Sequence, residues 1–399
     1  MAAGVSTASV DRRLDRDIRR LYALGGATTA ALLPFFTPLL QGRGITPDRI
    51  GLILAASAFA GVIAAPLWSH EADTRLGTTR ALTWSSVATA VCALALIPTG
   101  ADPWVVATVA ALMAAASAPG TAFADALALR VLGPARADDY GRIRRFASGG
   151  WAVAVVLFGL LYQVVGLSPE LWLYAAALLV YAAYVRRFPR AAPAPIEERG
   201  SRLGSVSAAF RESPNLPMFL IGLLLLSAAT SSTDGFVPLR MLGEGGGPFL
   251  IGVAAGIAAV IEIPFFTASA SLGARFGMRN LFLMGIAITV ATLVGFSVAD
   301  TPGAVAVIRA LAGAAFGLKY AALVVLTDRL VPAHLRNTGQ ALMQMASWGL
   351  GPIVGPAIGG FVYVRLGPPT LFAGAAVLAS VGGVLAWWAL RHVGGRDGA

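Results

Sequence analysis

The stretch Asp48-Arg-Ile-Gly-Leu-Ile-Leu-Ala-Ala-Ser-Ala-Phe-Ala-Gly-Val-Ile-Ala-Ala-Pro-Leu-Trp-Ser69 contains no charged side chain after its second residue. An α-helix rises about 1.5 Å per residue, so about 20 apolar residues cross the roughly 30 Å hydrocarbon core of a bilayer. This stretch has that length and that composition. It therefore predicts a membrane-spanning helix.

Apolar runs of this kind recur along the whole chain of 399 residues. The chain is 57% hydrophobic and 13% charged, whereas a soluble domain carries about 25% charged residues. Helices are expected because an open sheet edge is not satisfied in lipid, and the alternating pattern of barrel strands is absent. The sequence predicts an all-α membrane protein with twelve transmembrane helices, at residues 21–40, 48–69, 80–98, 103–129, 145–166, 169–186, 216–240, 249–271, 280–299, 302–328, 338–363 and 369–390.

The net charge of +10 is distributed unevenly between the two sides of the predicted membrane. Of the 30 Lys and Arg residues, 24 lie at the termini or in the loops on the same side as the termini, and 4 lie in the opposite loops. Cytoplasmic loops carry such an excess, so both termini are expected to be cytoplasmic. The basic character reflects topology and gives no support for a nucleic-acid partner.

Several classes of protein are disfavoured by what the chain contains. The only cysteine, Cys92, excludes an intramolecular disulfide, and the histidines His70, His334 and His392 are scattered, so no metal site or cofactor is indicated. The only lysine, Lys319, is not followed by Ser or Thr, which excludes a phosphate-binding loop of the ATPase type. No nucleophile–base pair emerges, and we expect no enzyme.

The first 20 residues lack the apolar core of a signal peptide, so the first helix is expected to remain in the mature protein.

The chain divides into two parts of six predicted helices each. A polar, proline-containing stretch predicts a cytoplasmic linker at 188–215, between an N-terminal bundle at 1–187 and a C-terminal bundle at 216–399. Weak internal similarity supports a duplication, because Ile-Gly begins a helix at both Ile50 and Ile251, and each helix runs toward a proline.

Charged residues lie inside the predicted helices of the second half. Arg309 and Lys319 share one helix, although a charge at a helix centre costs roughly 2.5–3.5 kcal/mol. Residue depths predict the pairs Asp234 with Arg309 and Glu262 with Lys319, with Asp234 to Lys319 as the alternative. Two interpretations remain open: these pairs fix helix packing, or Glu262 exchanges a coupling proton.

A second acid and arginine are expected to meet near the cytoplasmic side of the first half. Asp125 lies one or two turns before the end of the fourth predicted helix, and Arg144 lies near the start of the fifth. Arg144, Ser148 and Trp151 share one helical face, on which the guanidinium and the indole are suited to bind a polar solute with a ring.

The neighbouring arginines, Arg142 and Arg145, lie on another face of the same helix. Basic residues at a cytoplasmic helix start commonly anchor the helix at the membrane surface, and this is the role expected of both.

Several short motifs lie along the chain. They are Pro34-Phe-Phe-Thr-Pro38, Gly44-Ile-Thr-Pro-Asp-Arg-Ile-Gly51-Leu, Pro66-Leu-Trp68, Asp125-Ala-Leu-Ala-Leu and Tyr140-Gly-Arg-Ile-Arg. Together they resemble motifs of the major facilitator superfamily, in particular of the branch that holds lactose permease, the phenylpropionate permeases and the nucleoside–proton symporters. The resemblance covers nearly the whole chain.

The resemblance implies roles for individual residues. By similarity to lactose permease, Asp125, Arg144 and Trp151 are expected to bind substrate, and Lys319 is expected to pair with Asp234. The chain departs from that pattern one turn after Lys319, where Ala322 and Val325 replace the histidine and glutamate that serve proton coupling in the permease. Instead, Ile261-Glu-Ile-Pro264 resembles the Glu-Ile-Pro of sugar-efflux and phenylpropionate-type members, which leaves the direction of transport open.

The loop after the second predicted helix resembles the cytoplasmic gate of the superfamily. It contains Asp73, Arg75, Gly77 and Arg80, with one residue inserted before the glycine, and Arg275-Phe-Gly-Met-Arg279 partly repeats it. An ordinary basic loop is the alternative interpretation.

Together, these features predict a multi-pass transporter of the cell membrane that moves a small organic solute by alternating access. Proton-coupled symport of a sugar, an aromatic acid or a nucleoside is the preferred hypothesis. A proton-driven exporter of sugars or drugs and a non-transporting membrane sensor or scaffold are the alternatives. The sequence indicates no oligomeric state.

Overall fold

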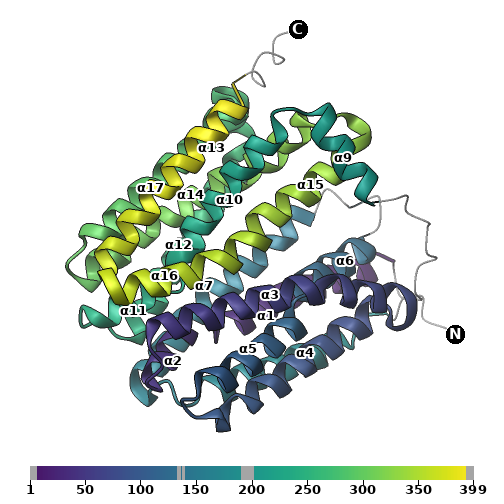
Figure 1. Ribbon diagram of the computed structural model, residues 1–399. Helices are drawn as coiled ribbons and strands as arrows, with labels where there is room; N and C mark the ends of the chain where they lie inside the picture. The colour runs from purple at the N-terminus through teal and green to yellow at the C-terminus, as the bar shows by residue number, and fades with distance from the viewer. Residues whose placement is uncertain (1–6, 133–135, 137–139, 190–201, 392–399) are drawn as a thin grey trace, which may run out of the picture.

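The computed structural model describes residues 7–132, 136, 140–189 and 202–391, which form helices and short connections with no strand among them. Two groups of helices are visible in Figure 1, one from the first half of the chain and one from the second. Residues 190–201 of the expected linker, the first six residues and residues 392–399, which include His392, lie outside the described residues.

The first half contains eight α-helices among its described residues. A π-helix, Ala72–Leu76, follows α3, and a 3₁₀ turn, Ile97–Thr99, follows α4. The α-helices are α1 (Thr7–Ala30), α2 (Phe36–Gly42), α3 (Pro47–Glu71), α4 (Thr78–Ala95), α5 (Pro103–Ser117), α6 (Gly120–Leu132), α7 (Tyr140–Val165) and α8 (Glu170–Val185).

The second half begins with a helix inside the segment expected to be a linker. This helix, α9 (Arg202–Glu212), packs through Ala209 against Val331 and Leu335, near the start of α15. The remaining helices are α10 (Leu216–Asp234), α11 (Val237–Gly243), α12 (Pro248–Phe276), α13 (Met278–Val298), α14 (Pro302–Leu330), α15 (Arg336–Gln344), α16 (Gly351–Leu366) and α17 (Pro368–Ala389), with a π-helix, Met345–Leu350, between α15 and α16.

Ten helical segments among the described residues are long and apolar enough to cross a membrane. The expected span 21–40 is divided, because the helix stops at Ala30 and resumes at Phe36 around Pro34, which has no N–H to donate. The expected span 169–186 forms α8, an apolar helix of 16 residues. These two segments account for the difference from the expected twelve.

The two halves contact each other through α3 against α16 and α7 against α12. Glycines permit both crossings: a Cβ at Gly51 would clash with the Pro356 carbonyl oxygen, and a Cβ at Gly159 would lie 2.8 Å from the Pro248 carbonyl oxygen. Close helix approach through small residues is the usual way in which membrane helices associate.

The contacts between the halves gather at the end that carries the connections before α3 and before α12. Thr37 Oγ1 donates to the Gly235 carbonyl at 2.6 Å, and the Phe249 N–H donates to Gln163 Oε1 at 3.3 Å. The two groups converge at α2 and α11 and diverge toward α6 and α9 (Figure 1). The halves are therefore joined at one end of the molecule.

Replacing Gly51 with alanine is expected to lower the free energy of unfolding by about 1–3 kcal/mol, because the new methyl group meets backbone that is not free to rotate away. The melting temperature in detergent measures this effect. Gly42→Ala is the matched control, since a Cβ there meets nothing within 4 Å. Equal melting temperatures for the two variants would contradict the close α3–α16 crossing.

A charged cavity between the two halves

A cavity of about 530 Å³ lies among helices of both halves. The first half contributes Leu33 and Trp151, and the second half contributes most of the remaining lining. Four charged side chains, Asp234, Glu262, Arg309 and Lys319, border it. A concave site with a few polar groups on an apolar wall is typical of sites that bind small molecules.

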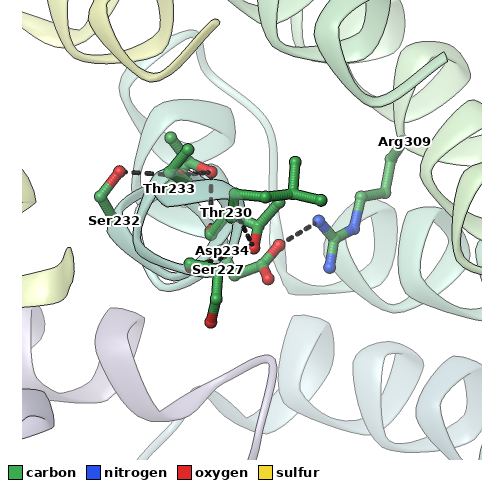
Figure 2. Close-up of polar contacts among 8 residues, drawn as sticks. Ser227, Thr230, Ser232, Thr233, Asp234 and Arg309 are labelled. Carbon is green, nitrogen blue, oxygen red and sulfur yellow. Dashed lines mark hydrogen bonds and ion pairs between the residues drawn. The ribbon is translucent and has the colours of Figure 1, made fainter. Parts of the chain in front are cut away.

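Asp234 and Arg309 form the ion pair expected from their depths. Arg309 Nη1 donates to Asp234 Oδ1 at 2.8 Å, from α14 to the last residue of α10. Figure 2 shows the two side chains pointing toward each other beside the hydroxyl-rich end of α10. Thr230 and Thr233 donate to backbone carbonyls of their own helix, so their hydroxyl groups do not donate to the Asp234 carboxylate.

Glu262 is held beside α14 by a close crossing of α12 and α14. A Cβ at Gly313 would clash with the Ala258 carbonyl oxygen, and a Cβ at Gly317 would lie 2.8 Å from the Glu262 carbonyl oxygen. The two glycines, one turn apart, let the helix backbones touch. The Glu262 side chain reaches the cavity as a result.

The expected pairing of Glu262 with Lys319 is wrong for this conformation. Lys319 Nζ instead donates to Thr289 Oγ1 of α13 at 2.7 Å, with its stem lying over Gly285. Asp234, the alternative partner, pairs with Arg309 instead. The reason is the direction in which the Lys319 side chain extends. It points toward α13, where Gly285 leaves room for its stem, and away from α12.

Asp125 and Arg144 also form their expected ion pair, but outside the cavity. Arg144 Nη1 donates to Asp125 Oδ2 at 2.8 Å, and the Tyr22 hydroxyl donates to Asp125 Oδ1 at 2.7 Å. Arg144 thus joins α7 to α6 near the end at which the two halves diverge (Figure 1).

Trp151 borders the cavity because α7 is pressed against α1. A Cβ at Gly26 would clash with the Ala147 carbonyl oxygen, and a Cβ at Gly150 would clash with that of Ala23. Ser148, although half-buried on the same helix, is not part of the cavity lining.

The expected gate residues lie at the far end of α3 from the contacts between the halves. Asp73 and Arg75 belong to the π-helix that follows α3, and Gly77 has φ 71°, a left-handed conformation that glycine adopts without strain. Arg80 is exposed on α4. Among the described side chains, these residues form no ion pair with one another. Arg75 Nη1 instead lies 3.7 Å from Glu71 Oε1.

Three aromatic side chains of the cavity were not expected from the sequence. Phe316 and Tyr320 of α14 stack with ring centroids 5.6 Å apart, and Trp348 packs edge-on against both. The spacing of Phe316 and Tyr320, one helical turn, was a usable signal. No spacing pattern pointed to Trp348, because the position of its ring depends on the π-helix. No group of metal-ligating side chains occurs in the parts of the chain that the structure describes.

Most of the chain matches a known protein family: the model of the MFS_1 like family covers residues 18–373. The chain belongs to this family. It is a multi-pass membrane transporter of the major facilitator superfamily and not an enzyme, as the family and its structural neighbours are membrane transporters.

Relatives of this major facilitator protein are named for different activities. A maltose permease of Geobacillus stearothermophilus is 28% identical over 341 residues, covering 84% of each chain. The multidrug resistance protein MdtG of Dickeya zeae is 24% identical over 390 residues, covering 93% of each chain. The crystal structure of the nucleoside transporter NupG has a TM-score of 0.81 and 18% identity, over 95% of this chain and 98% of that one. This last likeness shows the fold alone.

Proposed function

We propose that the protein is a proton-coupled secondary transporter that takes up a small organic solute, of which a sugar is the first candidate. The observation that carries the proposal is the cavity between the halves, bordered by four charged residues that lie within apolar helical segments, Asp234, Glu262, Arg309 and Lys319. Charges at membrane depth are costly and usually mark a solute or proton path.

The proposal includes twelve crossings with both termini cytoplasmic, arranged as bundles at 1–187 and 216–399 with a linker at 188–215. α1 with α2, and the short α8, supply the two crossings beyond the ten long apolar segments. With this orientation the joined end of the molecule faces outward. The conformation then corresponds to the inward-facing state of an alternating-access cycle, with Asp73, Arg75, Gly77 and Arg80 as parts of a separated cytoplasmic gate.

Glu262 is the proposed proton site. It borders the cavity, and no described side chain forms an ion pair or hydrogen bond with it. A charge at membrane depth is costly, and protonation of a carboxylate removes it. A carboxyl group on the wall of a cavity between the two halves is therefore suited to exchange a proton during alternating access.

The proposed substrate contacts are Trp151, Arg309, Asp234 and Lys319 within the cavity, with Asp125, Arg144 and Ser148 nearer its cytoplasmic side. Carboxylate–guanidinium pairs offer both acceptors and donors to sugar hydroxyls, and an indole face packs against the apolar face of a pyranose ring. The similarity to the maltose permease supports this substrate class.

A second candidate function is proton-driven export. The similarity to MdtG over 93% of the chain favours it, and the same cavity serves either direction. A membrane sensor without turnover is the alternative from another class, and ligand binding without flux would distinguish it.

Uptake into proteoliposomes under an imposed proton gradient tests the proposal, with labelled maltose, glucose, a phenylpropionate and uridine as probes. Accumulation of one of these solutes on the side to which protons flow supports proton symport. Accumulation against the proton flow identifies an exporter, and binding without flux contradicts transport.

A further inference from the structure

The two halves of the protein repeat one arrangement of side chains. In α7, Arg144 is paired with an aspartate at 2.8 Å and is followed seven residues later by Trp151. In α14, Arg309 is paired with an aspartate at 2.8 Å and is followed seven residues later by Phe316. Seven residues are two helical turns, so each aromatic ring lies on the same face as its arginine.

The repeat places an aromatic residue on the cavity wall in each half. α7 begins at the diverging end of the molecule and α14 begins at the joined end. In each helix the aromatic residue lies about 10 Å further from the helix start than the arginine does. Trp151 and Phe316 both border the cavity. The site therefore has a ring-binding surface on each half.

The surface on the second half is the larger of the two. Phe316 and Tyr320 stack with an interplanar angle of 16°, and the Trp348 ring packs at 69° to that of Phe316, so the three form two walls of a corner. Trp348 remains 51% exposed although it borders the cavity. An aromatic corner with an open face is suited to a ring that the protein itself does not supply.

A π-helix holds Trp348 in this position. Residues Met345–Leu350 form the π-helix, and the Ser227 hydroxyl of α10 donates to the Ser347 carbonyl. Such segments are rare and occur often at functional sites, because they turn a side chain away from the regular helical face. The backbone irregularity and the exposed indole are two independent observations at one place.

We propose that Phe316, Tyr320 and Trp348 form a second ring-binding subsite, opposed to Trp151, and that the cavity selects solutes of two linked sugar rings over single sugars. The proposal rests on the proposed function of sugar transport. A volume of about 530 Å³ lies within the range of pockets that enclose ligands larger than one ring. One ring packs on Trp151 and the other in the aromatic corner.

Calorimetric titration of the purified full-length protein with maltose and with glucose tests the proposal. The expected result is that maltose binds at least about tenfold more tightly than glucose. Phe316→Leu and Trp348→Leu are each expected to weaken maltose about tenfold and to leave glucose binding within about twofold. Trp172→Leu, which removes an exposed indole on α8 away from the cavity, is the control and is expected to change neither affinity.

Equal binding of the two sugars, no binding of maltose, or equal weakening of both sugars by the variants would overturn the subsite. Melting temperatures that match the unaltered protein show that a loss of affinity is not a loss of folding. The result is independent of coupling: proton-coupled uptake without a preference for maltose overturns the subsite alone. A preference for maltose without proton movement refutes the coupling alone.

Discussion

Arg144→Lys is expected to lower the initial rate of solute uptake by about 100-fold or more while the protein remains folded. The guanidinium donates to Asp125, which also accepts a hydrogen bond from the Tyr22 hydroxyl. A lysine keeps the positive charge but has a single ammonium group on a stem without the planar fork, so it does not hold Asp125 and bind a polar solute in one geometry. Uptake into proteoliposomes, at equal amounts of folded protein, measures the loss.

Arg145→Lys is the matched control for this variant. Arg145 is exposed on another face of α7, where its guanidinium lies 5.8 Å from the Phe146 ring. Its replacement is expected to leave uptake within about twofold, as surface substitutions usually do. Uptake by Arg144→Lys at the rate of the unaltered protein would remove Arg144 from the mechanism.

Neutralising either member of the Asp234–Arg309 pair is expected to reduce uptake by about 10- to 100-fold. Each single change, Asp234→Asn or Arg309→Gln, leaves its partner as an unpaired charge at membrane depth, which costs roughly 2.5–3.5 kcal/mol at a helix centre. The double variant removes both charges together. It is therefore expected to lose less than the two single variants combined, with a coupling energy of about 1–2 kcal/mol.

The exposed pair of Asp48 and Arg49, 3.7 Å apart, is the control for this cycle. Exposed ion pairs contribute about 0–1 kcal/mol, so the control cycle is expected to be close to additive. If the Asp234 and Arg309 effects were also additive, the contact seen in the structure would have no role in the transport cycle.

The lengths of the apolar stretches in the sequence predicted most of the fold, because a chain that crosses lipid has few alternatives to helices. Ten of the expected spans correspond to helical segments long and apolar enough to cross a membrane. The division of the first span at Pro34 and the helix α9 within the linker were missed. Composition alone does not reveal where tertiary contacts support a short helix or where a proline breaks a long one.

The site was predicted in part, and the errors have a physical cause. Depth along each helix correctly paired Asp234 with Arg309 and Asp125 with Arg144. Depth does not give the rotation of a helix about its axis, which directs Lys319 toward Thr289. The pairing of Lys319 with Glu262 was wrong because the sequence does not reveal this rotation.

The position of Trp348 required a different kind of information. Regular helical spacing does not place its ring beside those of Phe316 and Tyr320, because it belongs to a π-helix whose turn is wider than that of an α-helix. Irregular backbone is set by packing against neighbouring helices. It is therefore the part of a site that a sequence pattern conveys least.

Proton movement across the membrane of proteoliposomes, recorded when a transported solute is added, tests the central claim most directly. The unaltered protein is expected to carry protons in the same direction as the solute. Glu262→Gln is expected to carry none while it still exchanges solute across the membrane, because an amide does not take up the coupling proton. Proton movement by Glu262→Gln equal to that of the unaltered protein would contradict the account.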